Sequence, residues 1–92
     1  MSLELVWSPL ALSRLREIHA FIAQDKPDAA ERLATRIISV VEALRDHPNL
    51  GHACSEPGIR ELNIGGTPYI IIYRRRGPRI VILDIWHAAR AK

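Results

Sequence analysis

The chain begins with an alternation of apolar and polar positions. Leu3, Leu5 and Trp7 are apolar and are separated by single residues, so residues 3–7 are predicted to form a short strand with these side chains on one face. Ser8 and Pro9 follow directly. A hydroxyl residue before a proline is typical of a helix start, because the hydroxyl caps free amides and proline suits the first helical position.

Two helical patterns come next, joined by a short connection. The first is expected to end near Gln24, and the second to begin at Pro27 and stop before Pro48, since the residue preceding a proline is disfavoured in the helical region. So short a connection predicts a helical hairpin. Each helix has one apolar stripe at spacings of three and four residues. The stripes consist of Ala11, Leu15, Ile18 and Ile22 in the first helix, and Ala30, Leu33, Ile37, Val40 and Leu44 in the second.

The second half of the chain has the pattern of strands and turns. Residues 47–58 are rich in Pro, Asn and Gly and are predicted to be a loop. Apolar, β-branched runs at 59–64, 69–74 and 79–86 predict three strands, with turns at Gly65-Gly66 and over residues 75–78. Turns this short make the three strands an antiparallel meander.

The predicted order is therefore β-α-α-β-β-β. We assign the chain to the α+β class, as one domain over residues 1–92 in which a helical hairpin packs on one face of a small antiparallel sheet. The position of the first strand within the sheet stays open at this stage.

Charge is divided unevenly along the chain. The net charge is +3, but residues 1–58 carry six basic and eight acidic side chains, whereas residues 59–92 carry seven basic and two acidic ones. Eleven of the 13 basic residues are arginine, which suits bidentate contacts with carboxylates or phosphates. We therefore expect an anionic partner for the C-terminal sheet: nucleic acid, an acidic protein surface or an acidic peptide.

The sequence also bears on the cellular compartment and on cofactors. No apolar run is long enough to cross a membrane, and the N-terminus lacks the pattern of a secretory signal, so we expect no membrane partner. The single cysteine, Cys54, has no internal partner for a disulfide, which fits a reducing cytoplasm. His47, His52 and Cys54 lack a fourth ligand at a recognisable spacing, so we predict no metal and no other cofactor.

Several pieces of sequence resemble one known family. The tryptophan before the first helix, the proline opening the second, and the stretches HPNLG, IREL, PYIIIYR and IWHAAR occur in the order and spacing of the RelE/ParE superfamily of toxins from type II toxin–antitoxin modules. The resemblance covers essentially the whole chain. It implies a small bacterial toxin that is neutralised by a cognate antitoxin whose C-terminal segment wraps it.

The superfamily divides by target. RelE-like members cleave mRNA in the ribosomal A site without metal, whereas ParE-like members poison DNA gyrase. The sequence stretches IREL and PYIIIYR, together with the helical hairpin, resemble the ParE branch more closely. The resemblance therefore favours a non-enzymatic gyrase inhibitor, with a RelE-like mRNA endoribonuclease on the ribosome as the alternative. An inactive member that only binds an antitoxin is a further alternative.

A ribonuclease would need an acid, a base and cations beside the scissile phosphate. Arg60, Arg74 and His87 lie on or beside adjoining predicted strands, and they are the catalytic candidates under that alternative alone. His87 would be the acid and the arginines would hold the phosphate. A strong base is missing, because only His52 and Glu56 are near.

The candidates for partner binding have structural alternatives. Arg60 could form a structural ion pair, His87 could simply end a strand, and the arginines of residues 74–79 could flank a solvated turn. Tryptophans at the sheet could belong to the core or line an antitoxin groove. The predicted partner-binding residues are Trp7, Arg60, Arg74, Arg76, Arg79, Trp86 and Arg90.

Overall fold

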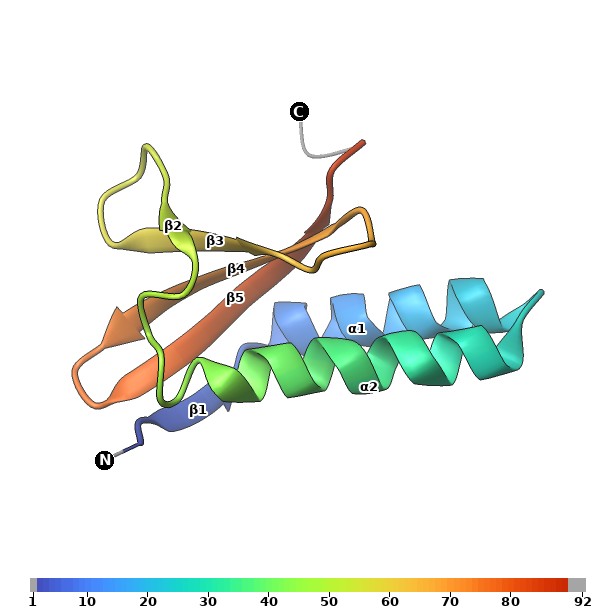
Figure 1. Ribbon diagram of the computed structural model, residues 1–92, viewed down its shortest axis with the longest axis horizontal. Coiled ribbons are helices and arrows are strands. Elements are labelled where there is room, and N and C mark those ends of the chain that lie inside the picture. The colour runs from blue at the N-terminus through green and yellow to red at the C-terminus, as the bar shows by residue number, and fades with distance from the viewer. Residues whose placement is uncertain (1, 90–92) are drawn as a thin grey trace.

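A helical hairpin lies across one face of a twisted sheet in the computed structural model, which describes residues 2–89 (Figure 1). The order of elements agrees with the predicted one, with one short strand added between α2 and β3. The α+β fold predicted from the sequence is thereby confirmed. The elements are β1 (Glu4–Trp7), α1 (Pro9–Ala23), α2 (Pro27–Ala43), β2 (His52–Ala53), β3 (Ile59–Asn63), β4 (Tyr69–Arg76) and β5 (Arg79–His87).

The sheet has the strand order β1-β5-β4-β3-β2. The pairs β3–β4 and β4–β5 are antiparallel, as the short turns predicted. The open question of the first strand is settled by its pairing: β1 lies parallel to β5, with Glu4 opposite Arg79 and Trp7 opposite Ile82. The antiparallel meander is therefore extended into a mixed sheet of five strands.

Helix α1 starts at the predicted place. The Ser8 hydroxyl accepts a hydrogen bond from the amide of Ala11 at 3.0 Å, and Pro9 occupies the first turn. The same hydroxyl donates to the carbonyl of Leu83 at 2.9 Å. One side chain therefore caps the helix and fixes it to β5, which determines where α1 begins relative to the sheet.

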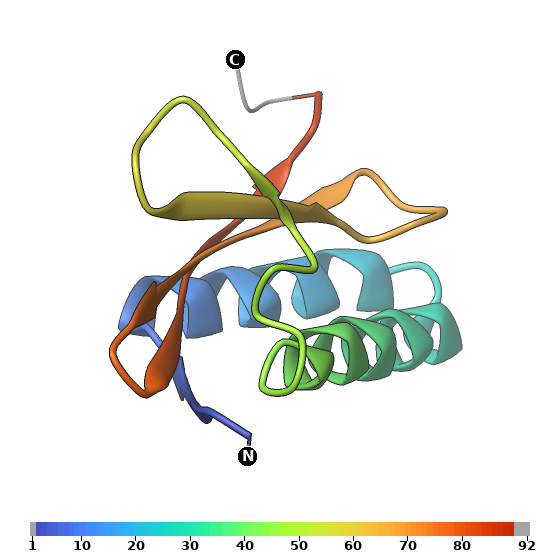
Figure 2. The same cartoon turned by 60° about the vertical axis from the view of Figure 1, so that its left-hand side comes forward.

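The hairpin covers the sheet face that carries Ile71, Tyr73, Ile80 and Ile82, all fully buried (Figure 2). Ile37 of α2 belongs to the same core. Burial contributes about 1.5–3 kcal/mol for each large apolar side chain, so these contacts hold helices and sheet together. The predicted stripes and the Leu3-Leu5-Trp7 face are confirmed, since their members lie in this core or pack against it, with Ala30 also buried and Ile22 partly so.

Two local predictions were wrong. Strand β4 continues through Arg75 and Arg76, so the turn consists only of Gly77 and Pro78, and Gly77 adopts a φ of 58°. A positive φ at the first central position of a two-residue hairpin suits glycine. The loop over 47–58 also contains β2, which pairs with β3 through His52 and Glu61. In residues 2–89 no helix combines the length and the apolar character that crossing a bilayer requires.

Candidate functional site

The residues predicted as a ribonuclease site do not converge. Arg60 is paired with Tyr73 and therefore points to the helix-covered face of the sheet, whereas Arg74 is the next residue of β4 and points to the opposite face. His87 is paired with Tyr69, four residues from Tyr73 along β4. That separation is about 13 Å along the strand, and His87 and Arg60 are also two strand spacings of about 4.8 Å apart.

Arg60 is bound to the loop that precedes β2. Its Nη1 donates to the carbonyl of Gly51 at 2.7 Å. The Tyr73 hydroxyl holds the same loop, because it accepts from the amide of Gly51 and donates to the carbonyl of Pro48, both at 2.9 Å. No carboxylate lies within 4.0 Å of Arg60 among residues 2–89, so the structural partner of this arginine is a backbone carbonyl.

Burial raises the pKa of the Tyr73 phenol, an effect that the hydrogen bond from Gly51 and the nearby Arg60 charge partly offset. Gly51 is closely surrounded at this point. A Cβ on it would lie 2.8 Å from the carbonyl oxygen of Glu61 and 2.8 Å from the Tyr73 ring. Arg60, Tyr73 and Gly51 thus form a compact latch over the core, which we call the loop latch.

His87 is the last residue of β5 and lies opposite Tyr69, the first residue of β4. Its ring meets that of Tyr69 edge to face, with centroids 5.3 Å apart, and its Nδ1 accepts from the amide of Ala89 at 3.2 Å. The two residues considered as a base, His52 and Glu56, are exposed in the loop region, with His52 3.8 Å from Glu61. Within the described part of the chain, no three His, Cys, Asp or Glu side chains group as metal ligands.

The open face of the sheet, turned away from the helices, carries an arginine-rich hollow of about 630 Å³ near the β4–β5 turn. The residues Val6, Arg74, Arg76, Arg79 and Val81 share that face by their strand register. Arg75 and Gly77 complete the lining. Guanidinium groups beside an apolar floor can bind an anion.

A groove of about 860 Å³ lies between α1 and the C-terminal half of β5. Strand β1 pairs with β5 only as far as Ile82, so the rest of this β5 edge faces α1 instead of a strand. Phe21 and Trp86 line the groove and are 72% and 38% exposed. The groove is therefore mainly apolar, with two exposed aromatic side chains at its wall.

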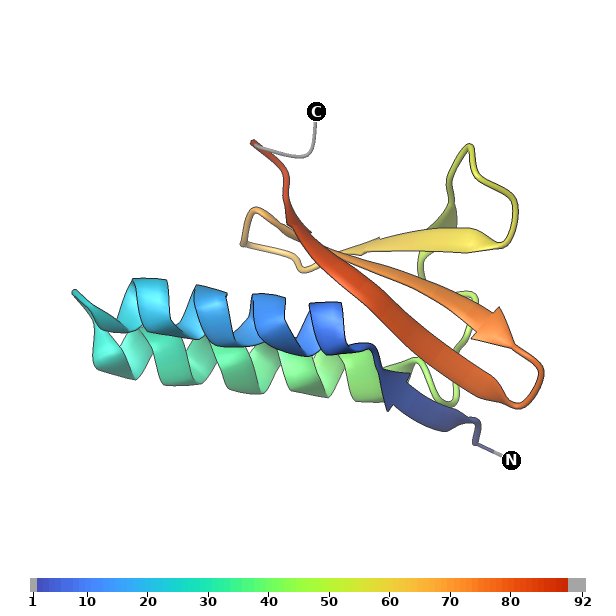
Figure 3. The ribbon, with the colours of Figure 1, turned by 180° about the vertical axis from the view of Figure 1, so that it is seen from behind.

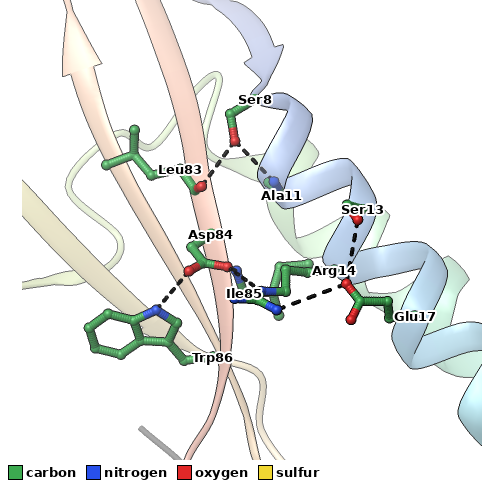
Figure 4. A network of polar contacts seen from close by, with 9 residues as sticks. All are labelled: Ser8, Ala11, Ser13, Arg14, Glu17, Leu83, Asp84, Ile85 and Trp86. Atoms are coloured by element: carbon green, nitrogen blue, oxygen red, sulfur yellow. Dashed lines mark hydrogen bonds and ion pairs between the residues drawn. The ribbon is translucent and has the colours of Figure 1, made fainter.

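A polar network joins α1 to β5 beside this groove (Figure 4). Asp84 accepts from Arg14 Nε at 3.1 Å and from the indole Nε1 of Trp86 at 3.0 Å. The hydrogen bond to Asp84 orients the ring of Trp86, which stays partly exposed. Arg14 also lies 3.9 Å from Glu17.

Among the remaining predicted residues, Trp7 packs against the core and lines neither the groove nor the hollow. Arg79 is paired with Glu4 at 2.8 Å, and Arg76 is exposed. Arg90, also predicted to bind a partner, lies outside the described residues. Sequence reasoning missed Arg14, Phe21 and Asp84; the signal that could have found Phe21 is its place off the apolar stripe of α1.

Comparisons with known proteins agree with this fold. The family model described as the ParE toxin of the type II toxin–antitoxin system, parDE, matches residues 5–92. The candidate toxin Y4kP of Sinorhizobium fredii is 43% identical over 82 residues, which cover 89% of this chain and 84% of Y4kP. Toxin RelE2 of Caulobacter vibrioides is 34% identical over 87 residues, covering 95% of this chain and 97% of RelE2.

Solved structures show the same architecture. A chain of the chromosomal ParDE toxin–antitoxin system from P. aeruginosa has a TM-score of 0.84 at 25% identity, over 94% of this chain and 96% of that one. A chain of the RelBE2 toxin–antitoxin complex from Mycobacterium tuberculosis has a TM-score of 0.71 at 18% identity, over 95% and 99%, which bears on the fold alone. With the match over residues 5–92, the chain belongs to the ParE toxin family of type II toxin–antitoxin systems.

Proposed function

We propose that this toxin acts by binding and inhibiting DNA gyrase without catalysing a reaction itself, and that a cognate antitoxin neutralises it. The family membership supports the toxin role, and the ParDE system is among its structural neighbours. The target, the mode of action and the antitoxin site are the parts that we propose.

The observation that carries the proposal is the separation of the three candidate catalytic residues. Metal-free cleavage of RNA needs an acid, a base and cationic groups within hydrogen-bond reach of one phosphate, about 2.6–3.2 Å each. Arg60 and Arg74 project from opposite faces of the sheet, and Arg60 donates to Gly51. His87 is several residues further along the sheet. This arrangement favours a surface that grips a target over a site that cleaves RNA.

The groove between α1 and β5 is the surface we propose for the antitoxin. It presents Phe21 and Trp86 beside an edge of β5 that has no strand neighbour after Ile82 in the described residues. An extended segment can pair with such an edge while its apolar side chains enter the groove. Arg14 and Asp84 would border this segment and add polar contacts.

Expression of the toxin in bacteria without an antitoxin tests the target. A gyrase inhibitor is expected to induce the DNA-damage response and to leave mRNA intact. Arrested translation with cleaved mRNA and undamaged DNA would instead support the ribonuclease alternative, which the RelE name of the Caulobacter relative also suggests. A chain that is harmless when expressed alone would contradict both and support an inactive antitoxin-binding member.

One variant sharpens the same experiment. His87→Ala removes the candidate acid and leaves the loop latch and the hollow unchanged. If gyrase is the target, toxicity should persist in this variant. If His87 instead transfers a proton, the rate of mRNA cleavage should fall by about 10²–10⁴-fold. The Trp7 side chain, which packs against the core, is unsuitable as a control because its removal would disturb folding.

A further inference from the structure

Of the four arginines that line the hollow on the open face, only Arg79 has an acidic partner within residues 2–89. Within residues 2–89, no carboxylate lies within 4.0 Å of Arg74 or Arg76, whereas Arg79 is paired with Glu4 at 2.8 Å. The Nε of Arg74 is buried and has no hydrogen-bond acceptor among the described residues. A buried N–H of a charged group without an acceptor is costly.

The strand register arranges these charges as a row. Arg76 and Arg79 face each other across the β4–β5 turn, and Arg74 is two residues from Arg76 on the same face. Like charges placed directly opposite each other on a sheet are destabilising. Strands β1 and β5 lie side by side (Figure 3). Val6 of β1 and Val81 of β5 are a register pair, and both line the hollow.

From this geometry we infer that the hollow binds the phosphate backbone of duplex DNA, at a surface separate from the antitoxin groove. The inference deepens the proposed function and rests on it, because gyrase acts on duplex DNA. Arg74, Arg76 and Arg79 each contact a backbone phosphate. The toxin then touches the DNA of its target complex as well as the enzyme.

The lining of the hollow favours duplex DNA over a single strand. Single strands are held by stacking their bases on aromatic side chains, and the hollow is lined only by arginine, valine and glycine. A duplex keeps its bases stacked inside and offers phosphates alone to such a surface. Arginine clusters also recognise acidic peptide motifs. An acidic peptide is therefore the competing ligand in the test below.

Titration of a short fluorescent duplex with the free toxin tests the inference across a series of salt concentrations. For three phosphate contacts, the logarithm of the association constant should fall with the logarithm of the salt concentration, with a slope of about −2.7. Arg76→Gln should reduce the magnitude of this slope by about 0.9. Arg32→Gln on α2, an exposed arginine away from the hollow, is the matched control and should leave the slope unchanged.

Glu4→Gln provides a gain of binding that misfolding cannot imitate. It removes the one carboxylate that pairs with an arginine of the hollow within residues 2–89, and it should strengthen duplex binding several-fold. The inference is overturned if Glu4→Gln does not strengthen binding or if Arg32→Gln weakens it as much as Arg76→Gln. Tighter binding of a single-stranded oligonucleotide, or stronger competition by polyglutamate than by unlabelled duplex, would also overturn it.

A supercoiling assay on the same protein separates this inference from the proposed function. If the wild-type toxin inhibits gyrase but shows no arginine-dependent duplex binding, the DNA site is refuted and the gyrase proposal stands. If the toxin binds the duplex as predicted but leaves supercoiling unaffected, the gyrase proposal fails and the DNA site stands.

Discussion

Removing one hydroxyl from the loop latch should destabilise the whole domain. Tyr73 is fully buried, and its hydroxyl serves both the amide of Gly51 and the carbonyl of Pro48 at 2.9 Å. Tyr73→Phe leaves the buried amide of Gly51 and the partly buried carbonyl of Pro48 without their hydrogen-bond partner. Each unsatisfied group costs about 1–3 kcal/mol, so for two groups we expect the free energy of unfolding to fall by about 2–6 kcal/mol. That is a large share of the roughly 5–15 kcal/mol typical of a domain.

Urea unfolding followed by circular dichroism measures this loss. The midpoint should fall while the slope of free energy against urea stays the same, because the surface exposed on unfolding hardly changes. Tyr69→Phe is the matched control: Tyr69 is also buried on β4, and no hydrogen bond of its hydroxyl is found within residues 2–89. A loss below about 0.5 kcal/mol for Tyr73→Phe, or an equal loss for Tyr69→Phe, would refute the reasoning.

Three further outcomes are expected. Gly51→Ala should lower thermal stability, because the new Cβ would lie 2.8 Å from the Glu61 carbonyl and the Tyr73 ring, and overpacking costs about 1–3 kcal/mol; an unchanged melting temperature would contradict this. The pKa of Tyr73 in the folded protein is raised above 10.0, so the neutral phenol stabilises the fold below pH 10. This contribution is lost as the pH rises through the folded pKa. Unfolding measured at increasing alkaline pH should show the loss, and Tyr73→Phe should remove this pH dependence. Trp86→Ala should weaken antitoxin binding by about 10-fold or more in calorimetry, as aromatic anchors often do, whereas Leu50→Ala, an exposed residue outside the groove, should not.

The helices and the meander were predictable because each depends on local chemistry. Ser8 and Pro9 start α1, and short turns force the three C-terminal strands to be antiparallel. The parallel pairing of β1 with β5 was not predictable, since it joins segments about 75 residues apart with no signal in either alone. Strand β4 runs into Arg75 and Arg76, although a charged pair beside Gly77 and Pro78 suggested a turn.

The candidate site was harder to predict than the fold. Arg60 lies on the same face of β3 as Leu62, because alternate residues of a strand share a face. Its acceptor, however, is the backbone carbonyl of Gly51, and such acceptors carry no residue-specific signal. Convergence of His87 with the arginines depended on register, and the sequence does not determine register over that distance. The ion pair of Arg14 with Asp84 depends on how α1 crosses β5, which is a tertiary property.

We propose that this ParE-family toxin inhibits gyrase by binding and does not cleave RNA. The most direct test of this proposal is supercoiling of relaxed plasmid by purified gyrase, with the wild-type toxin and the His87→Ala variant compared at equal concentrations. We predict that both inhibit supercoiling to a similar degree and that neither cleaves mRNA on translating ribosomes. Undiminished supercoiling together with mRNA cleavage that His87→Ala abolishes would contradict the account.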